Sequence, residues 1–222
     1  MLFFISEPKS QVGVNIGLVF DGSLSEDGVM KLKDFGKRLV DSFEVSEEGA
    51  RFSLMSFGFR PSLESKFKDE LDGEKTKEKI DGMKRQFGVA RMDKALKDAA
   101  DTMFSEENVG KRSSLPKILV LLTSDGAQSY GPELDKAVES LKNADIKPLV
   151  VVIGDGLEDE VKKIAPKEED VFRLDDVDEL PVTKDPLVER VLANAKGKGD
   201  RSGNCSLLAE MFSEKYSICK CF

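Results

Sequence analysis

Two short runs of oxygen-bearing side chains carry the chemistry that this sequence offers. Asp21, Ser23 and Ser25 form an Asp-x-Ser-x-Ser pattern directly after an apolar run, and Asp125 follows a second apolar run about a hundred residues later. Carboxylate and hydroxyl oxygens are the hard ligands that Mg²⁺, Mn²⁺ and Ca²⁺ prefer in proteins. The pattern therefore predicts a divalent-cation site formed by Asp21, Ser23, Ser25 and Asp125.

Each half of this pattern also has a purely structural interpretation. Ser25 precedes Glu26 and Asp27 and could serve only as the N-cap of a helix. Asp125 and Gly126 could form only a turn. The metal interpretation is favoured because both runs follow predicted strands, and open α/β sheets bind ligands at the carboxyl ends of their strands.

The elements that must position these residues alternate between strand and helix patterns. Apolar runs predict strands, and apolar residues at helical spacing predict helices. The strands are expected at 14–20, 51–57, 62–67, 118–122, 148–153 and 171–174, and the helices at 27–43, 74–83, 92–103, 132–143, 158–164 and 185–195. This order predicts an α/β fold of the doubly wound, Rossmann-like kind, with a mostly parallel central sheet flanked by helices and one short antiparallel edge strand.

Composition excludes several classes of function. The chain has 34 Lys and Arg against 42 Asp and Glu, a net charge of −8, which argues against a nucleic-acid partner. It has no histidine, so Ser-His-Asp and Cys-His catalysis are excluded. Neither a phosphate-binding P-loop nor a dinucleotide-binding glycine fingerprint is present, so we expect no enzyme activity.

The chain divides into three parts. We expect an N-terminal extension at 1–13, a folded domain at 14–196, and a glycine-rich break followed by a tail at 197–222. The tail holds all of the cysteines, Cys205, Cys219 and Cys221, which suggest a disulfide within the tail or between chains, and Asn204 begins a glycosylation pattern. No apolar run is long enough for a membrane span, and no leader is visible, so the protein is either a trimmed extracellular form or cytoplasmic.

Several stretches of the sequence together resemble the von Willebrand factor A family, which includes integrin inserted domains and the A domains of matrix collagens and matrilins. The resemblance covers roughly 14–195 and is carried by 17–25, 94–96, 118–126, 161–165 and 170–180. It implies the same sheet flanked by helices, and a metal-ion-dependent adhesion site. In that site the last coordination position of the cation accepts an acidic side chain from a partner protein.

One position departs from the family pattern. The family takes a threonine ligand from the loop before the helix that contains Ala95 and Leu96, and here that position falls on Ala90, which has no side-chain oxygen. No Thr or Ser lies between Gly88 and Leu96, so Asp93 is the sole candidate substitute, and Arg91 brings a positive charge nearby. We expect a degenerate site with weak or absent cation binding.

The resemblance favours a non-enzymatic adhesion module that is secreted and binds an extracellular protein of the matrix or cell surface. Two alternatives remain open from the sequence. One is a structural component of matrix assembly that forms disulfide-linked oligomers through its tail, and the other is a cytosolic scaffold of the same fold.

Overall fold

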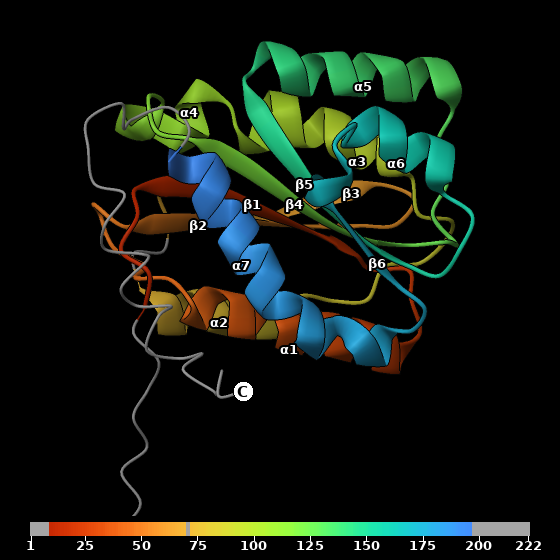
Figure 1. The fold of residues 1–222 in the computed structure, drawn as a ribbon, viewed down its shortest axis with the longest axis horizontal. Helices are drawn as coiled ribbons and strands as arrows, with labels where there is room; N and C mark the ends of the chain where they lie inside the picture. The colour runs from red at the N-terminus through yellow and green to blue at the C-terminus, as the bar shows by residue number, and fades with distance from the viewer. Residues whose placement is uncertain (1–8, 70–71, 197–222) are drawn as a thin grey trace, which may run out of the picture.

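The computed structural model describes residues 9–69 and 72–196 and contains a central sheet between two layers of helices (Figure 1). The elements in chain order are β1 (Val14–Asp21), α1 (Glu26–Asp41), β2 (Ala50–Phe57), β3 (Pro61–Ser65), α2 (Gly73–Gly82), α3 (Met92–Asp98), the π-helical turn η1 (Ala99–Met103), α4 (Glu106–Val109), η2 (Gly110–Arg112), β4 (Lys117–Ser124), α5 (Gly131–Asn143), β5 (Ile146–Ile153), α6 (Glu158–Ile164), η3 (Glu168–Asp170), β6 (Val171–Leu174), η4 (Val177–Glu179) and α7 (Leu180–Lys196).

The sheet has the strand order β3-β2-β1-β4-β5-β6. Every neighbouring pair is parallel except β2 and β3, which pair antiparallel at the edge. From β1 the chain continues to β2 toward one edge of the sheet, and from β4 it continues to β5 toward the opposite edge. The direction of strand addition therefore reverses between the two central strands. Ligands of doubly wound sheets bind at such a reversal. The predicted fold class, including the short antiparallel edge strand, is confirmed.

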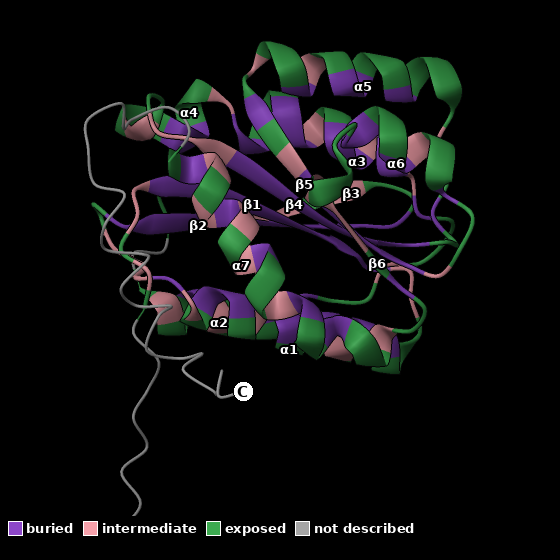
Figure 2. Cartoon of the chain, viewed as in Figure 1, coloured by how far each residue is buried: buried purple, intermediate pink, exposed green. Residues whose placement is uncertain are grey.

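Both faces of the sheet are buried, as Figure 2 shows by the purple colour of the strands. Helices α1, α2 and α7 pack on one face, and α3, α4, α5 and α6 pack on the other (Figure 1). Helix α1 shows why the sequence folds this way, because Leu32, Phe35 and Leu39 recur at helical spacing and are buried. Gly36 allows a close approach, since a Cβ there would lie 2.8 Å from the ring of Phe20. The first helix is thereby fixed against the strand that ends at Asp21.

Helix α7 begins at Leu180, five residues before the start at Asp185 that the sequence predicts. Pro186 favours a helix that starts close to it, yet in the structure Pro186 lies inside α7. The burial of Leu187 and Val191 against the sheet stabilises this longer helix. Pro181 in the first turn suits a helix start, since its missing N–H has no partner there in any helix.

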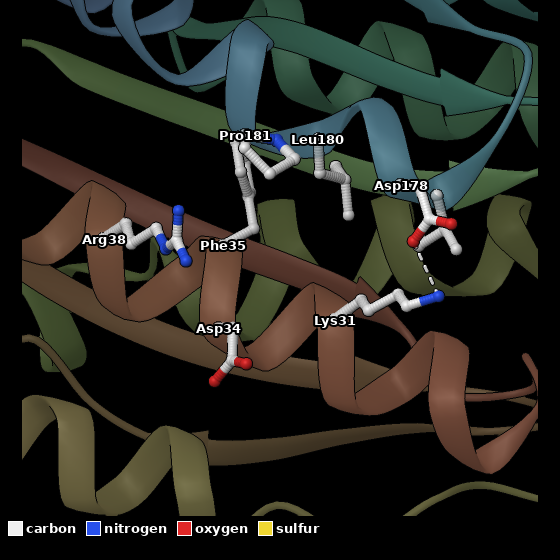
Figure 3. Close-up of a pocket in the computed structure, with 8 residues that line it drawn as sticks. Lys31, Asp34, Phe35, Arg38, Asp178, Leu180 and Pro181 are labelled. Atoms are coloured by element: carbon white, nitrogen blue, oxygen red, sulfur yellow. Dashed lines mark ion pairs between the residues drawn. The ribbon is translucent and has the colours of Figure 1, made fainter.

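The beginning of α7 contacts α1 around a small cavity of about 110 Å³ (Figure 3). Phe35 and Leu180 line it, and the Lys31 ammonium lies 2.7 Å from a carboxylate oxygen of Asp178. Hydrogen bonds to Asp178 and Asp27 raise the pKa of Lys31 above its ordinary value. Because both carboxylate partners of Lys31 are exposed, the ion pairs contribute little, and the apolar contact holds the two helices together.

The ends of the chain are described only in part. Ser10, in the predicted extension, exchanges backbone hydrogen bonds with Ser42 and Glu44, at 2.9 and 3.0 Å, so the end of this segment packs on the domain. The predicted tail at 197–222, with Asn204 and its cysteines Cys205, Cys219 and Cys221, lies outside the described residues, and the three-part division of the chain stays a prediction. None of the helices described is long and apolar enough to cross a membrane.

Candidate metal centre

Asp21 is a completely buried carboxylate at the end of β1. Its Oδ1 accepts hydrogen bonds from the backbone N–H of Ser23 at 3.0 Å and from the Ser23 hydroxyl at 2.6 Å. Its Oδ2 accepts a hydrogen bond from the Ser124 hydroxyl at 2.8 Å. All three donors are neutral, and no lysine or arginine of the described residues forms an ion pair with Asp21. A buried anion without a cationic partner is costly, so the position favours a cation.

The loop after Asp21 has a defined local structure. The hydrogen bond from Ser23 N–H to Asp21 is an Asx-turn, which reverses the chain as the strand ends. The Ser25 hydroxyl is the N-cap of α1 and accepts a hydrogen bond from Gly28 N–H at 3.1 Å. The interpretation of Ser25 as a helix N-cap is therefore confirmed. It leaves a lone pair of the hydroxyl oxygen for a second interaction.

Asp125 follows the last residue of β4 and is exposed. Its backbone N–H donates to Ile153 O at 2.9 Å, which ties it to the end of β5. Gly154 has φ +85°, and a Cβ there would lie 2.6 Å from the Asp125 carboxylate. The glycine thus permits the close approach of the Asp125 side chain. No hydrogen bond of the described residues joins Asp125 directly to Asp21.

Ala90, at the predicted threonine position, is completely buried and supplies no side-chain oxygen. Its backbone carbonyl accepts from Gln128 N–H at 2.8 Å, which fixes this loop against the segment after β4.

Asp93 is unavailable as a substitute ligand because Arg91 occupies both of its oxygens. The Arg91 guanidinium donates to Asp93 at 2.9 and 2.5 Å and lies over the ring of Tyr130, 4.1 Å from its centroid. The Asp93 side chain is fully buried in this contact. Hydrogen bonding to Asp93 raises the pKa of Arg91 above its ordinary value. The positive charge near the site is therefore already neutralised.

Ser124 is a site residue that the sequence interpretation missed. Its hydroxyl bridges the ends of β4 and β1 through its 2.8 Å hydrogen bond to Asp21. The sequence did contain one indication of this role, because Ser124 follows a predicted buried strand and immediately precedes Asp125. In the structure Ser23 and Ser124 are hydrogen-bonded to Asp21, whereas no hydrogen bond among the described residues joins Ser25 or Asp125 to it.

The donor set fits a hard divalent cation with several positions left for water. Oxygen ligands suit Mg²⁺, Mn²⁺ or Ca²⁺, and Mg²⁺ usually retains several waters. Within the described residues, no three Asp, Glu, Cys or His side chains gather into one cluster. Two carboxylates and a few hydroxyls form the whole candidate site, consistent with a weak one.

The sequence matches the family model of the von Willebrand factor type A domain over residues 15–185. It is 28% identical to the human collagen alpha-5(VI) chain over 72% of this chain. It is 30% identical to chicken matrilin-1 over 69% of this chain, and 30% identical to rat von Willebrand factor A domain-containing protein 1 over 72%. The chain spans 6%, 31% and 38% of these relatives, respectively.

The fold is also found in solved structures of proximal thread matrix protein 1 from the mussel byssus. One superposes with a TM-score of 0.76 at 23% identity, over 82% of this chain and 48% of that one. Another, described as having a zinc-occupied MIDAS motif, superposes with a TM-score of 0.71 at 25% identity, over 82% of this chain and 46% of that one.

Proposed function

The chain belongs to the von Willebrand factor type A domain family, and from that premise we propose that it is a non-enzymatic, protein-binding module of the extracellular matrix with a degenerate cation site. The relatives are collagen VI and matrilin chains, which supports a matrix location and an extracellular protein partner. The metal-ion-dependent adhesion site of the family is the natural place for such a module to engage an acidic side chain of its partner.

The observation that carries the cation proposal is the environment of Asp21. This carboxylate is buried at the reversal of the strand order and has only neutral hydrogen-bond donors. In the proposal Asp21, Ser23, Ser25 and Asp125 hold the ion, and Ala90 leaves one position to water. The zinc reported for the MIDAS motif of the mussel protein supports a divalent cation at this place in the fold.

The same geometry supports adhesion rather than catalysis. The hydroxyls of Ser23 and Ser124 donate their hydrogens to Asp21, so each is held by a buried acceptor instead of facing a substrate. The absence of histidine from the sequence removes the usual base that would activate them. A bound cation would supply an open coordination position for a partner carboxylate. The protein residues would orient the ion and exclude water from the buried side of Asp21.

Calorimetric titration with Mg²⁺ and Mn²⁺ tests the cation site. The expected result is weak binding by the native chain and none by Asp21→Asn, which keeps the shape of the side chain without its charge. Asp159→Asn is the matched control, because it removes an exposed carboxylate from α6, and it should leave the titration unchanged. Equal binding by Asp21→Asn and the native chain would contradict the assignment.

Surface plasmon resonance against a panel of purified matrix proteins tests the adhesive function. Saturable binding to at least one immobilised protein is expected. Repeating the measurement in Mg²⁺ and in EDTA separates cation-dependent from cation-independent recognition. A folded chain that binds no member of the panel would count against the proposed function.

A further inference from the structure

Exposed apolar side chains gather on the loops beside Asp21. The described residues include six large hydrophobic side chains that are exposed, and four of them lie on loops at the carboxyl edge of the sheet. Phe87 is the most exposed, at 78%. We call the four the aromatic rim: Phe59, Phe87, Val89 and Tyr130. Exposed apolar groups that occur together, unlike scattered ones, mark interaction sites.

The loops that carry the rim are hydrogen-bonded into one surface. Arg91 N–H donates to Gly58 O at 2.8 Å, next to Phe59, and Gln128 N–H donates to Ala90 O at 2.8 Å, which joins the loop of Tyr130. Gln86 N–H donates to Gly22 O at 2.8 Å, immediately after Asp21. The rim is therefore a preorganised surface that continues into the candidate metal centre, and little conformational entropy is lost when a partner binds.

A cation lies over each aromatic ring of the rim. Lys94 Nζ is 4.4 Å from the centroid of Phe59, and the Arg85 guanidinium is 5.5 Å from that of Phe87. The third is the Arg91 group over Tyr130, which is already paired with Asp93. Arg85 Nε also donates to Leu24 O at 2.7 Å, so its terminal N–H groups and the Lys94 ammonium are the groups that remain for an anion.

Arg85 and Lys94 have no carboxylate partner among the residues that the structure describes, although the chain carries eight more acids than bases. Several lysines elsewhere on the surface do pair with acids, as Lys31, Lys37 and Lys77 do. Arg85 and Lys94 differ from these lysines because each lies over an aromatic ring instead. The rim combines apolar rings with unpaired positive charge, and its complement is a segment with carboxylates beside apolar side chains.

We propose that the aromatic rim, with Arg85 and Lys94, docks an acidic segment of a partner polypeptide without requiring a cation. The inference rests on the proposed binding function but not on the metal centre. Aromatic and arginine side chains are the residues most often found at the energetic centre of interfaces. Single-stranded nucleic acid would also use rings and cations. The net charge of −8 and the few cations here disfavour it, because phosphate recognition needs a larger basic surface.

Fluorescence polarisation in EDTA tests the proposal, using a short labelled peptide in which aspartates flank leucines. The native chain should bind it saturably, and a peptide with asparagine in place of aspartate should bind more weakly. Phe87→Ala should lower the affinity about tenfold, a loss of about 1.4 kcal/mol. Because Phe87 is largely exposed, its replacement should leave the melting temperature unchanged. Val182→Ala, an equally exposed site on α7, is the control for loss of apolar surface and should bind normally.

Charge is tested separately from apolar contact. Lys94→Glu should weaken peptide binding, whereas Lys162→Glu, which makes the same change of net charge on α6, should not. Asp21→Asn should keep peptide binding even where it abolishes Mg²⁺ binding. The cation proposal and the docking proposal are therefore tested by separate measurements, and one can be wrong while the other holds. Three results would overturn the inference: equal binding by Lys94→Glu and the native chain, loss of peptide binding in EDTA, or tighter binding of oligo-dT than of the acidic peptide. Self-association that Phe87→Ala abolishes would also overturn it, because the occupant would then be a second copy of the chain.

Discussion

Restoring the threonine at Ala90 is the perturbation that best separates a degenerate cation site from a merely structural one. Ala90 is completely buried, and its carbonyl is hydrogen-bonded to Gln128, so the backbone is fixed and a new side chain must fit the existing space. Ala90→Thr adds a methyl group and a hydroxyl there. Ala90→Val adds nearly the same volume without an oxygen, so it reports the packing cost alone.

The two variants should behave differently in the presence of a cation. Overpacking a filled site costs about 1–3 kcal/mol in both. In chelator the threonine variant should be the less stable of the two, since a buried hydroxyl without a partner costs about 1–3 kcal/mol more. In Mg²⁺ at about 100 times the dissociation constant, binding stabilises the threonine variant by about 2.7 kcal/mol. For a chain of this size that corresponds to a rise in melting temperature of about 5–11 °C.

Circular-dichroism melts in EDTA and in Mg²⁺ provide the assay. The valine variant and the native chain should shift little, because neither supplies the missing oxygen. The reasoning is refuted if the valine and threonine variants respond equally to Mg²⁺. It is also refuted if the native chain already binds Mg²⁺ tightly and the threonine adds nothing.

Three further outcomes are expected. Gly154→Ala should lower the melting temperature and weaken Mg²⁺ binding, because the new Cβ would collide with the Asp125 carboxylate. Gly156→Ala is the control, since Gly156 also has a positive φ but has open space around it, and this variant should affect stability alone. In urea denaturation, Arg91→Met should cost about 3–5 kcal/mol by leaving the buried Asp93 carboxylate unpaired. Asp93→Asn should cost less, since the remaining cation can turn to solvent, and equal costs would contradict this account. Truncation after Lys196, where α7 ends, should leave cooperative thermal unfolding intact, and loss of the transition would place part of the tail in the core.

The sheet and its ligand-binding edge could be predicted because they depend on local patterns. Apolar runs locate the buried strands, and the alternation of strands with helices dictates parallel pairing. Once β1 and β4 are central neighbours, Asp21 and Asp125 must emerge at the same edge. That edge lies at the reversal of strand order, which is why two short and common motifs were informative.

Other features depend on contacts between distant segments, which a sequence pattern does not contain. Ser124 was overlooked because a serine at a strand end has many uses, and its hydrogen bond to Asp21 exists only after β1 and β4 pair. Helix α4 is too short for a periodic signal. The exposed rings of Phe59, Phe87 and Tyr130 come from separate loops and looked like isolated apolar residues in the sequence.

One loop carries both the predicted threonine position of the candidate cation site and part of the aromatic rim. Ala90 is buried and has no side-chain oxygen, while the next residue, Arg91, pairs with Asp93 and covers Tyr130. The position at which the proposed site lacks an oxygen therefore lies next to Arg91, whose side chain covers Tyr130 and whose N–H bonds Gly58 O. If the rim binds a partner without a cation, a stronger metal site would add little to recognition. Ala90→Thr should then raise Mg²⁺ affinity while leaving the affinity for the acidic peptide in EDTA unchanged. A parallel gain in both would mean that cation and rim act on the same partner carboxylate.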